Sequence, residues 1–167
     1  MNHLSELSDL GAKLVEKAVD VYTVQGREVV SRWFHSGQDL DCMLWFSEKS
    51  DLVRFQMNLH GQIVDWSQSP SGATLQTGFI SEEEIGYGGG DVQVIECVVY
   101  DEVLSCQSVE TVFDLLASIS GFRDEWKAQI VAALRQGLEV SGKELRSFGA
   151  RRATRAPFWS RLKRLGR

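Results

Sequence analysis

The stretch that decides the fold runs from Arg54 to Trp66 and reads RFQMNLHGQIVDW. Two runs that alternate apolar and polar residues flank His60-Gly61, a dipeptide that suits the positive φ of a two-residue β-hairpin turn. Such a turn pairs Leu59 with Gln62 and fixes the register outward along both strands. The predicted pairs are Met57 with Val64 and Phe55 with Trp66 on an apolar face, and Asn58 with Ile63, Gln56 with Asp65 and Arg54 with Ser67 on a mostly polar face.

A sheet with one apolar and one polar face is typical of an antiparallel meander that packs against helices. Runs rich in β-branched and aromatic residues, bounded by turn residues, predict about six strands: 27–35, 41–47, 52–60, 62–68, 73–81 and 91–100. We therefore predict an α+β fold, an antiparallel β-meander of about six strands with one N-terminal and two C-terminal helices packed on one face.

The three helices are predicted from apolar residues at helical spacing. The segment from Ser8 to Tyr22 places Leu10, Leu14, Val15, Ala18 and Tyr22 on one face, and Gly26 follows it. A second helix is expected to begin near Ser108 as its N-cap and to stop around Gly121. A third runs from about Arg123 to Val140, with an apolar stripe made of Trp126, Ile130, Ala133, Leu134 and Leu138.

Charge divides the 167 residues into two parts. Residues 1–140 carry 9 Lys or Arg and 22 Asp or Glu, whereas residues 141–167 carry 9 Lys or Arg and a single Glu. We predict an acidic α+β domain over 1–140 and a basic, partly flexible amphipathic tail over 141–167. Because affinity for nucleic acid comes mainly from neutralising phosphates with Lys and Arg, the acidic body is not expected to bind it.

The tail resumes an amphipathic pattern after Pro157 and leaves three interpretations open. It could lie on an anionic membrane, dock on an acidic protein or nucleic acid, or fold back on the acidic surface of its own chain. The candidate contact residues in it are Arg151, Arg152, Arg155, Phe158, Trp159, Arg161, Lys163 and Arg164.

The cysteines indicate a reducing compartment. Cys42, Cys97 and Cys106 are odd in number, and Cys42 and Cys97 sit in apolar strand patterns typical of core residues. The N-terminal residues are polar and acidic, so no signal peptide is expected, and no apolar run reaches the ~20 residues that span a bilayer. We predict a cytoplasmic protein, with peripheral membrane contact through the tail as an option.

The chemistry-bearing residues favour structural roles. A thiolate nucleophile would need a base such as His35 beside Cys42 or Cys106. His3, His35 and His60 lack the companion ligands of metal motifs, so neither a metal nor a cofactor is predicted. The loop Gly86–Gly90 leads into a strand rather than a helix, which disfavours a phosphate site but leaves Tyr87 as a possible contact residue.

One resemblance extends beyond these patterns. The residues that carry it are Arg32–Ser36, Asp39–Asp41, Trp45, Arg54–Gln56, Gly61–Trp66 and Thr77-Gly78. This stretch, about residues 27–84, resembles the RomX-like polarity adaptors of predatory and gliding bacteria. The resemblance implies a non-catalytic adaptor that works with a response-regulator-type partner and a small Ras-like GTPase, and it implies a recognition surface around Trp33–His35 and Gln62–Trp66.

The sequence thus predicts a non-enzymatic regulatory or scaffolding module that binds other proteins. Its candidate contact residues outside the tail are Trp33, His35, Trp45, Gln62 and Tyr87. The alternative is a small ligand-binding protein or enzyme, with a pocket between sheet and helices near His35, Cys42 and the Gly86–Gly90 loop.

Overall fold

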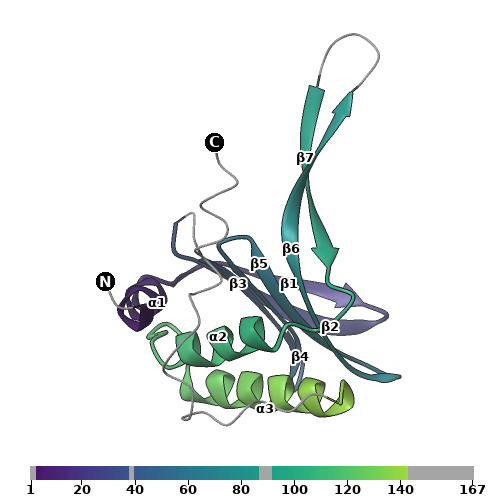
Figure 1. The fold of residues 1–167 in the computed structure, drawn as a ribbon. Coiled ribbons are helices and arrows are strands. Elements are labelled where there is room, and N and C mark those ends of the chain that lie inside the picture. The colour runs from purple at the N-terminus through teal and green to yellow at the C-terminus, as the bar shows by residue number, and fades with distance from the viewer. Residues whose placement is uncertain (1–2, 38–39, 87–91, 143–167) are drawn as a thin grey trace.

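The computed structural model describes residues 3–37, 40–86 and 92–142, with the backbone alone for 3–5, 83–86 and 92–95. A short helix precedes seven strands, and two helices follow them (Figure 1). The elements are α1 (His3–Ala12), β1 (Val15–Val24), β2 (Arg27–His35), β3 (Leu40–Ser47), β4 (Leu52–Leu59), β5 (Gln62–Ser69), β6 (Gly72–Gly86), β7 (Val92–Tyr100), α2 (Cys106–Leu116) and α3 (Asp124–Val140).

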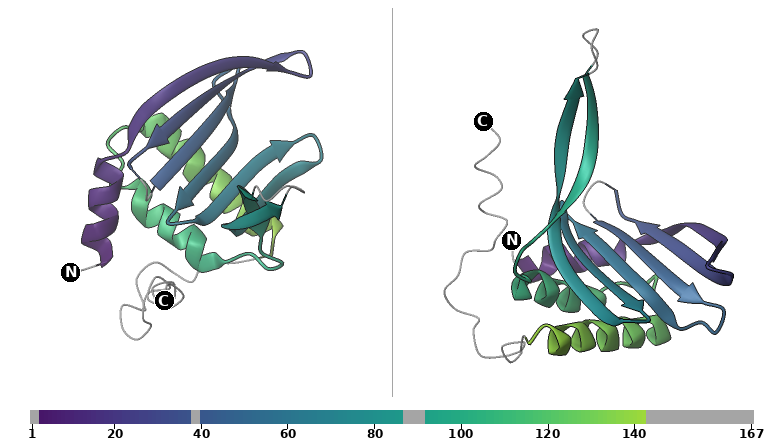
Figure 2. Two further views of the ribbon diagram at one scale, coloured as in Figure 1. Left: turned by 90° about the horizontal axis from the view of Figure 1, so that it is seen from above. Right: turned by 90° about the vertical axis from the view of Figure 1, so that its right-hand side faces the viewer.

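The seven strands form one antiparallel sheet in sequence order, β1 to β7, so every connection is a hairpin. Helices α2 and α3 lie side by side against one face of this sheet, and α1 lies against α2 (Figures 1 and 2). The predicted α+β fold class and meander are therefore confirmed, with seven strands instead of six. None of the described helices is both long and apolar enough to cross a membrane.

The core fills the space between the sheet and the two C-terminal helices. In β3 buried and half-buried residues alternate along the whole strand, as a sheet with one covered face requires. Phe34 packs edge-on against Phe122 of the α2–α3 connection, with ring centroids 4.8 Å apart, and Trp126 of α3 contacts both Phe34 and Phe46. Burying each such side chain contributes about 1.5–3 kcal/mol.

The predicted hairpin is confirmed residue by residue. Leu59 pairs with Gln62, and the ladder continues outward to Phe55 with Trp66 and Arg54 with Ser67. Both turn residues have positive φ, 50° for His60 and 81° for Gly61, as the two-residue turn requires. Phe55, Met57, Val64 and Trp66 are all buried on the helix side.

The first helix was predicted in the wrong place: it begins at His3 rather than near Ser8, and it does not continue beyond Ala12. Helix α1 ends there, and Val15–Val24 form strand β1, which pairs with β2. This segment is rich in β-branched residues, which fit a pleated strand, and its spacing satisfied a helical pattern by coincidence. The turn at Gln25-Gly26, with φ of 50° and 77°, is a second two-residue hairpin turn that joins β1 to β2.

The C-terminal helices agree better with prediction, apart from their ends. Helix α2 begins at Cys106, and its N-cap is Ser105, whose hydroxyl accepts a hydrogen bond from the Ser108 backbone N–H at 3.3 Å. The predicted N-cap, Ser108, is thus the residue that donates to the true cap. The apolar stripe predicted for α3, from Trp126 to Leu138, is buried.

Strands β6 and β7 extend past the rest of the sheet as a two-stranded ribbon (Figures 1 and 2). The last β6 residue that pairs with β5 is Phe79, and the Ile80 N–H still bonds to Gly61 of the β4–β5 turn. From Ser81 to Gly86 the strand pairs with β7 alone. Thr77 anchors the base of the ribbon. Its hydroxyl donates to Asp101 Oδ2 at 2.6 Å and accepts from the Ser105 backbone N–H at 2.8 Å, which ties the end of β7 to the start of α2.

Candidate functional site

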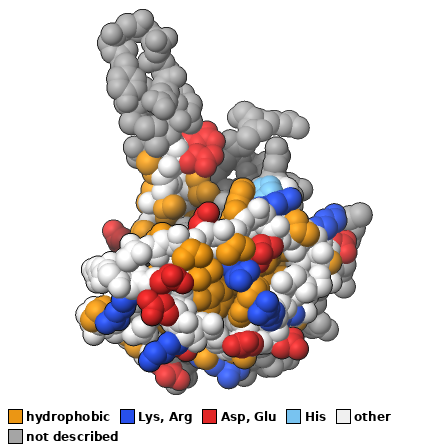
Figure 3. Space-filling view, turned by 180° about the vertical axis from the view of Figure 1, so that it is seen from behind, with side chains coloured by type: hydrophobic (Ala, Val, Ile, Leu, Met, Phe, Trp, Pro, Cys, Tyr) orange, Lys and Arg blue, Asp and Glu red, His pale blue; other side chains and the backbone are white. Residues whose placement is uncertain are grey.

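The face of the sheet that turns away from the helices, called the open face here, is the candidate site. Seen from behind, hydrophobic side chains gather in the middle of the molecule with charged ones around them (Figure 3). The register places Trp33 beside Met43, and Trp45 beside Arg54, in adjacent rows of this face. Among the described residues, no helix covers these side chains.

Asp65 organises one half of the open face. Although it lies opposite the helices, only 6% of it is exposed. Arg54 donates to both of its carboxylate oxygens, from Nε to Oδ1 at 3.2 Å and from Nη2 to Oδ2 at 2.7 Å, and the Tyr100 hydroxyl donates to Oδ2 at 2.8 Å. The Arg54 guanidinium also lies over the Trp45 ring, 4.9 Å from its centroid. We call Trp45, Arg54, Asp65 and Tyr100 the Asp65 cluster.

The electrostatics of this cluster follow from the buried carboxylate. The hydrogen bonds that Arg54 donates to Asp65 raise the pKa of Arg54, and the smaller cost of burying the guanidinium does not reverse this effect. Partial burial raises the pKa of Tyr100, and the hydrogen bond to Asp65 adds to it. Arg54 therefore stays a cation and Tyr100 a neutral donor at physiological pH. Both side chains are held in one orientation by the same acceptor.

Asp41 organises the other half of the open face. Its Oδ1 accepts from Trp33 Nε1 at 3.1 Å and lies 2.7 Å from His35 Nδ1. The Trp33 and His35 rings lie 5.6 Å apart, so the three side chains form one contiguous group, called the Asp41 cluster. Trp33 is 39% exposed, which leaves much of its ring available for contact.

The structure places three of the predicted contact residues together. Trp33, His35 and Trp45 all lie on the open face, whereas Gln62 lies on the helix side next to α2. Tyr87 and all eight tail residues, Arg151, Arg152, Arg155, Phe158, Trp159, Arg161, Lys163 and Arg164, lie outside the described residues.

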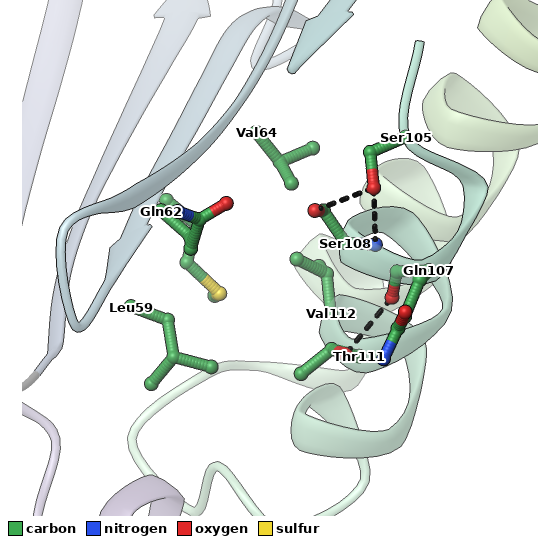
Figure 4. A pocket seen from close by; sticks show the side chains of 9 residues that line it. Leu59, Gln62, Val64, Ser105, Gln107, Ser108, Thr111 and Val112 are labelled. Atoms are coloured by element: carbon green, nitrogen blue, oxygen red, sulfur yellow. Dashed lines mark hydrogen bonds between the residues drawn. The ribbon is translucent and has the colours of Figure 1, made fainter. Parts of the chain in front are cut away.

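Gln62 lines a small cavity between β4, β5 and α2 (Figure 4). The cavity measures about 30 Å³, room for one or two waters and far less than the ~300–1,000 Å³ of small-molecule sites. Several of its polar side chains already form local hydrogen bonds. The Ser108 hydroxyl donates to Ser105 Oγ at 2.9 Å, and the Thr111 hydroxyl donates to the Gln107 carbonyl. This cavity therefore presents few free polar groups to a ligand.

A second, open hollow of about 330 Å³ lies beside the base of the ribbon. It is bordered by Thr77 and by the segment from Asp101 to Leu104, and it extends to Ser141. Neither hollow includes His35 or Cys42. The two residues lie on opposite faces of the sheet, so a pocket between the sheet and the helices does not contain both of them.

His35 and Cys42 lie on opposite faces of the sheet. Cys42 pairs with Phe34 and faces the helices, 1% exposed, whereas His35 pairs with Asp41 on the open face. Burial raises the pKa of the Cys42 thiol well above its ordinary value, so it stays protonated. Cys97, expected in the core, is only half-buried, as is Cys106. Within the described ranges, no three His, Cys, Asp or Glu side chains are placed to hold a metal.

Sequence reasoning missed the members of the Asp65 cluster other than Trp45. The hairpin register already placed Arg54 and Asp65 on one face, in adjacent rows, so their ion pair could have been found. Tyr100 carried no local signal, because its contact with Asp65 depends on the pairing of β5, β6 and β7.

Comparison with protein-family models, with curated proteins and with solved structures finds no match for this chain.

Proposed function

We propose that this chain is a non-catalytic protein-interaction module that binds its partner through the open face of the sheet. One observation carries the proposal: Trp33, Trp45, Arg54 and Tyr100 stand on a face that no described helix covers. Asp41 and Asp65 hold three of these side chains by hydrogen bonds, and the fourth, Trp45, lies under the Arg54 guanidinium. Trp, Tyr and Arg are the residue types that dominate the binding energy of protein interfaces.

Pre-organisation strengthens this argument. A long side chain that becomes immobile on binding loses about 0.5–1.5 kcal/mol of conformational freedom. Arg54 is already held by two hydrogen bonds and a ring contact, and Trp33 is held by Asp41. Binding a partner to these side chains therefore costs less conformational entropy. This property is expected of a recognition surface rather than of a sheet face that only contacts solvent.

The partner class rests on the resemblance of residues 27–84 to RomX-like polarity adaptors. Six residues of the two clusters carry this resemblance: Trp33, His35, Asp41, Trp45, Arg54 and Asp65. An adaptor role in bacterial cell polarity or signalling follows, with a small Ras-like GTPase or a response-regulator-type protein as the partner. The basic tail adds contact with an acidic protein or an anionic membrane surface.

The test is co-purification from cells that express the chain natively, using the full chain with and without a double Trp33→Ala, Trp45→Ala change. We expect a reproducible set of proteins to be recovered with the wild type and lost with the double variant. A Val103→Ala, Val140→Ala variant removes exposed apolar side chains elsewhere and serves as the control. Equal recovery with all three proteins, at equal thermal stability, would refute the open face as the binding site.

A further inference from the structure

The β6–β7 ribbon ends the sheet with an edge that no other described strand covers. Strand β7 is last in the sheet order, so its only neighbour is β6, and β6 pairs with no residue of β5 beyond Phe79. Two-stranded ribbons without a third strand or a packed face are marginal in water. The described part of this ribbon stands away from the helices (Figures 1 and 2), so it lacks the packing that stabilises the rest of the sheet.

Two hydrogen bonds show which backbone groups of β7 are available. The Asp101 N–H donates to the Thr77 carbonyl at 2.8 Å, and the Ile80 N–H donates to the Gly61 carbonyl on the opposite side of β6. Because the groups in an antiparallel ladder point alternately to the two sides, the N–H and C=O of Val98 and Tyr100 point away from β6. They form a row of donors and acceptors ready for another strand.

The side chains beside this row have a distinct chemistry on each face. Val99 on the helix side is 38% exposed and follows the half-buried Cys97, while Val98 and Tyr100 on the other side are 40% and 38% exposed. Further along that second side, Glu96 lies directly opposite Glu82, and both are exposed. Like charges placed directly across a ladder repel, and no cation of the described residues is paired with either one.

The opposite edge of the sheet differs. Strand β1 also exposes valines, but it carries a bulge between Glu16 and Ala18 and three charged residues, Glu16, Lys17 and Asp20. Bulges and charged side chains of this kind discourage pairing with another strand. The described residues of β7 have no bulge, and the charged residue among them, Glu96, is an anion that a basic strand would neutralise.

We propose that the free edge of β7 accepts an extended peptide strand of a partner protein in which Lys or Arg alternates with apolar residues. The basic side chains lie beside Glu96, with Glu82 on the next strand, and the apolar ones lie beside Cys97 and Val99. Main-chain hydrogen bonds to Val98 and Tyr100 provide affinity, and the two glutamates provide selection for positive charge. This edge adjoins the Asp65 cluster at Tyr100, lies apart from the Asp41 cluster, and extends the binding surface of the open face onto the ribbon.

The probe is a fluorescein-labelled seven-residue peptide that alternates Val and Lys, compared with one that alternates Val and Glu. We expect saturable binding of the Val–Lys peptide by fluorescence anisotropy, weakened by salt, together with slower amide exchange at Val98 and Tyr100. Val98→Pro removes an edge N–H that makes no bond to β6, and it should weaken binding about tenfold or more. Val98→Thr keeps that N–H and is the matched control.

A Glu82→Gln, Glu96→Gln variant keeps the proposal testable even if the proline variant is less stable. It should lose the preference for the Val–Lys peptide over the Val–Glu peptide. Equal binding of both peptides by the wild type, or equal binding by Val98→Pro and Val98→Thr, would overturn the proposal. A concentration-dependent dimer that Val98→Pro abolishes would also overturn it, since the edge would then be occupied by a second copy of the chain.

Discussion

The two faces of the sheet are built from the same strands, yet they are held in different ways. On the helix side, Phe34, Leu44 and Phe55 are almost wholly buried against α2 and α3 and the loops that join them. On the open face, aromatic and basic side chains remain partly exposed and are fixed by Asp41 and Asp65. One face supplies stability through apolar burial, and the other supplies orientation through hydrogen bonds. The following predictions test this division.

The largest effect is expected from the helix side. Phe55→Ala removes a fully buried ring and should lower the free energy of unfolding by about 3–5 kcal/mol. Trp45→Ala, on the open face of the neighbouring strand, removes a larger but half-buried ring and should cost less than about 1.5 kcal/mol. Urea unfolding followed by circular dichroism measures both values. Equal losses would show that the open face also serves as core.

The second prediction concerns the carboxylate of the Asp65 cluster. Asp65→Ala leaves Arg54 and Tyr100 without their shared acceptor and should cost about 1–3 kcal/mol. The control is Asp20→Ala, which removes an exposed carboxylate of β1 that also lies on the open face. It should change the free energy of unfolding by no more than about 0.5 kcal/mol. The same urea experiment compares the two variants. A negligible loss for Asp65→Ala would mean that the cluster adds orientation without stability.

These predictions rest on features that the sequence revealed unequally. The β4–β5 hairpin could be predicted to the residue, because His60-Gly61 and the alternation on both sides are local signals that agree. Strand β1 could not, because its valines fit either a helical or an extended pattern, and only pairing with β2 decides between them. Strand β1 therefore forms the edge next to β2, whereas in the predicted six-stranded sheet residues 27–35 were the first strand.

The candidate site divides in the same way. Trp33, His35 and Trp45 could be named from residue type and strand position, whereas Tyr100 joins Asp65 only through the pairing of three strands. The resemblance implies that Gln62 belongs to the same recognition surface, but the period-two alternation of β5 turns it to the helix side. Long-range register is thus the information that a single sequence lacked.

A smaller effect is expected at Thr77, which is buried on the helix side. Thr77→Val keeps the shape of the side chain but removes its bonds to Asp101 and to the Ser105 N–H, and should cost about 1–2 kcal/mol. Thr74→Val, at an exposed position on the open face of β6, is the matched control. Amide exchange should quicken at Ser105 in the first variant only. If both variants exchange alike, Thr77 does not anchor α2 to the ribbon.

The smallest effect is a pH dependence that belongs to the open face. Because the pKa of Tyr100 is raised above its ordinary value of about 10, the folded chain retains a proton that the unfolded chain releases. The resulting stability is fully present below pH ~10 and is lost as the pH rises through the folded-state pKa. Unfolding free energies at pH 9 and at successive points above pH 10 should therefore fall more steeply for the wild type than for Tyr100→Phe. Parallel declines in the two proteins would show that the hydroxyl is not held by Asp65 in solution, and the open face would then lose one of its two fixed anchors around that carboxylate.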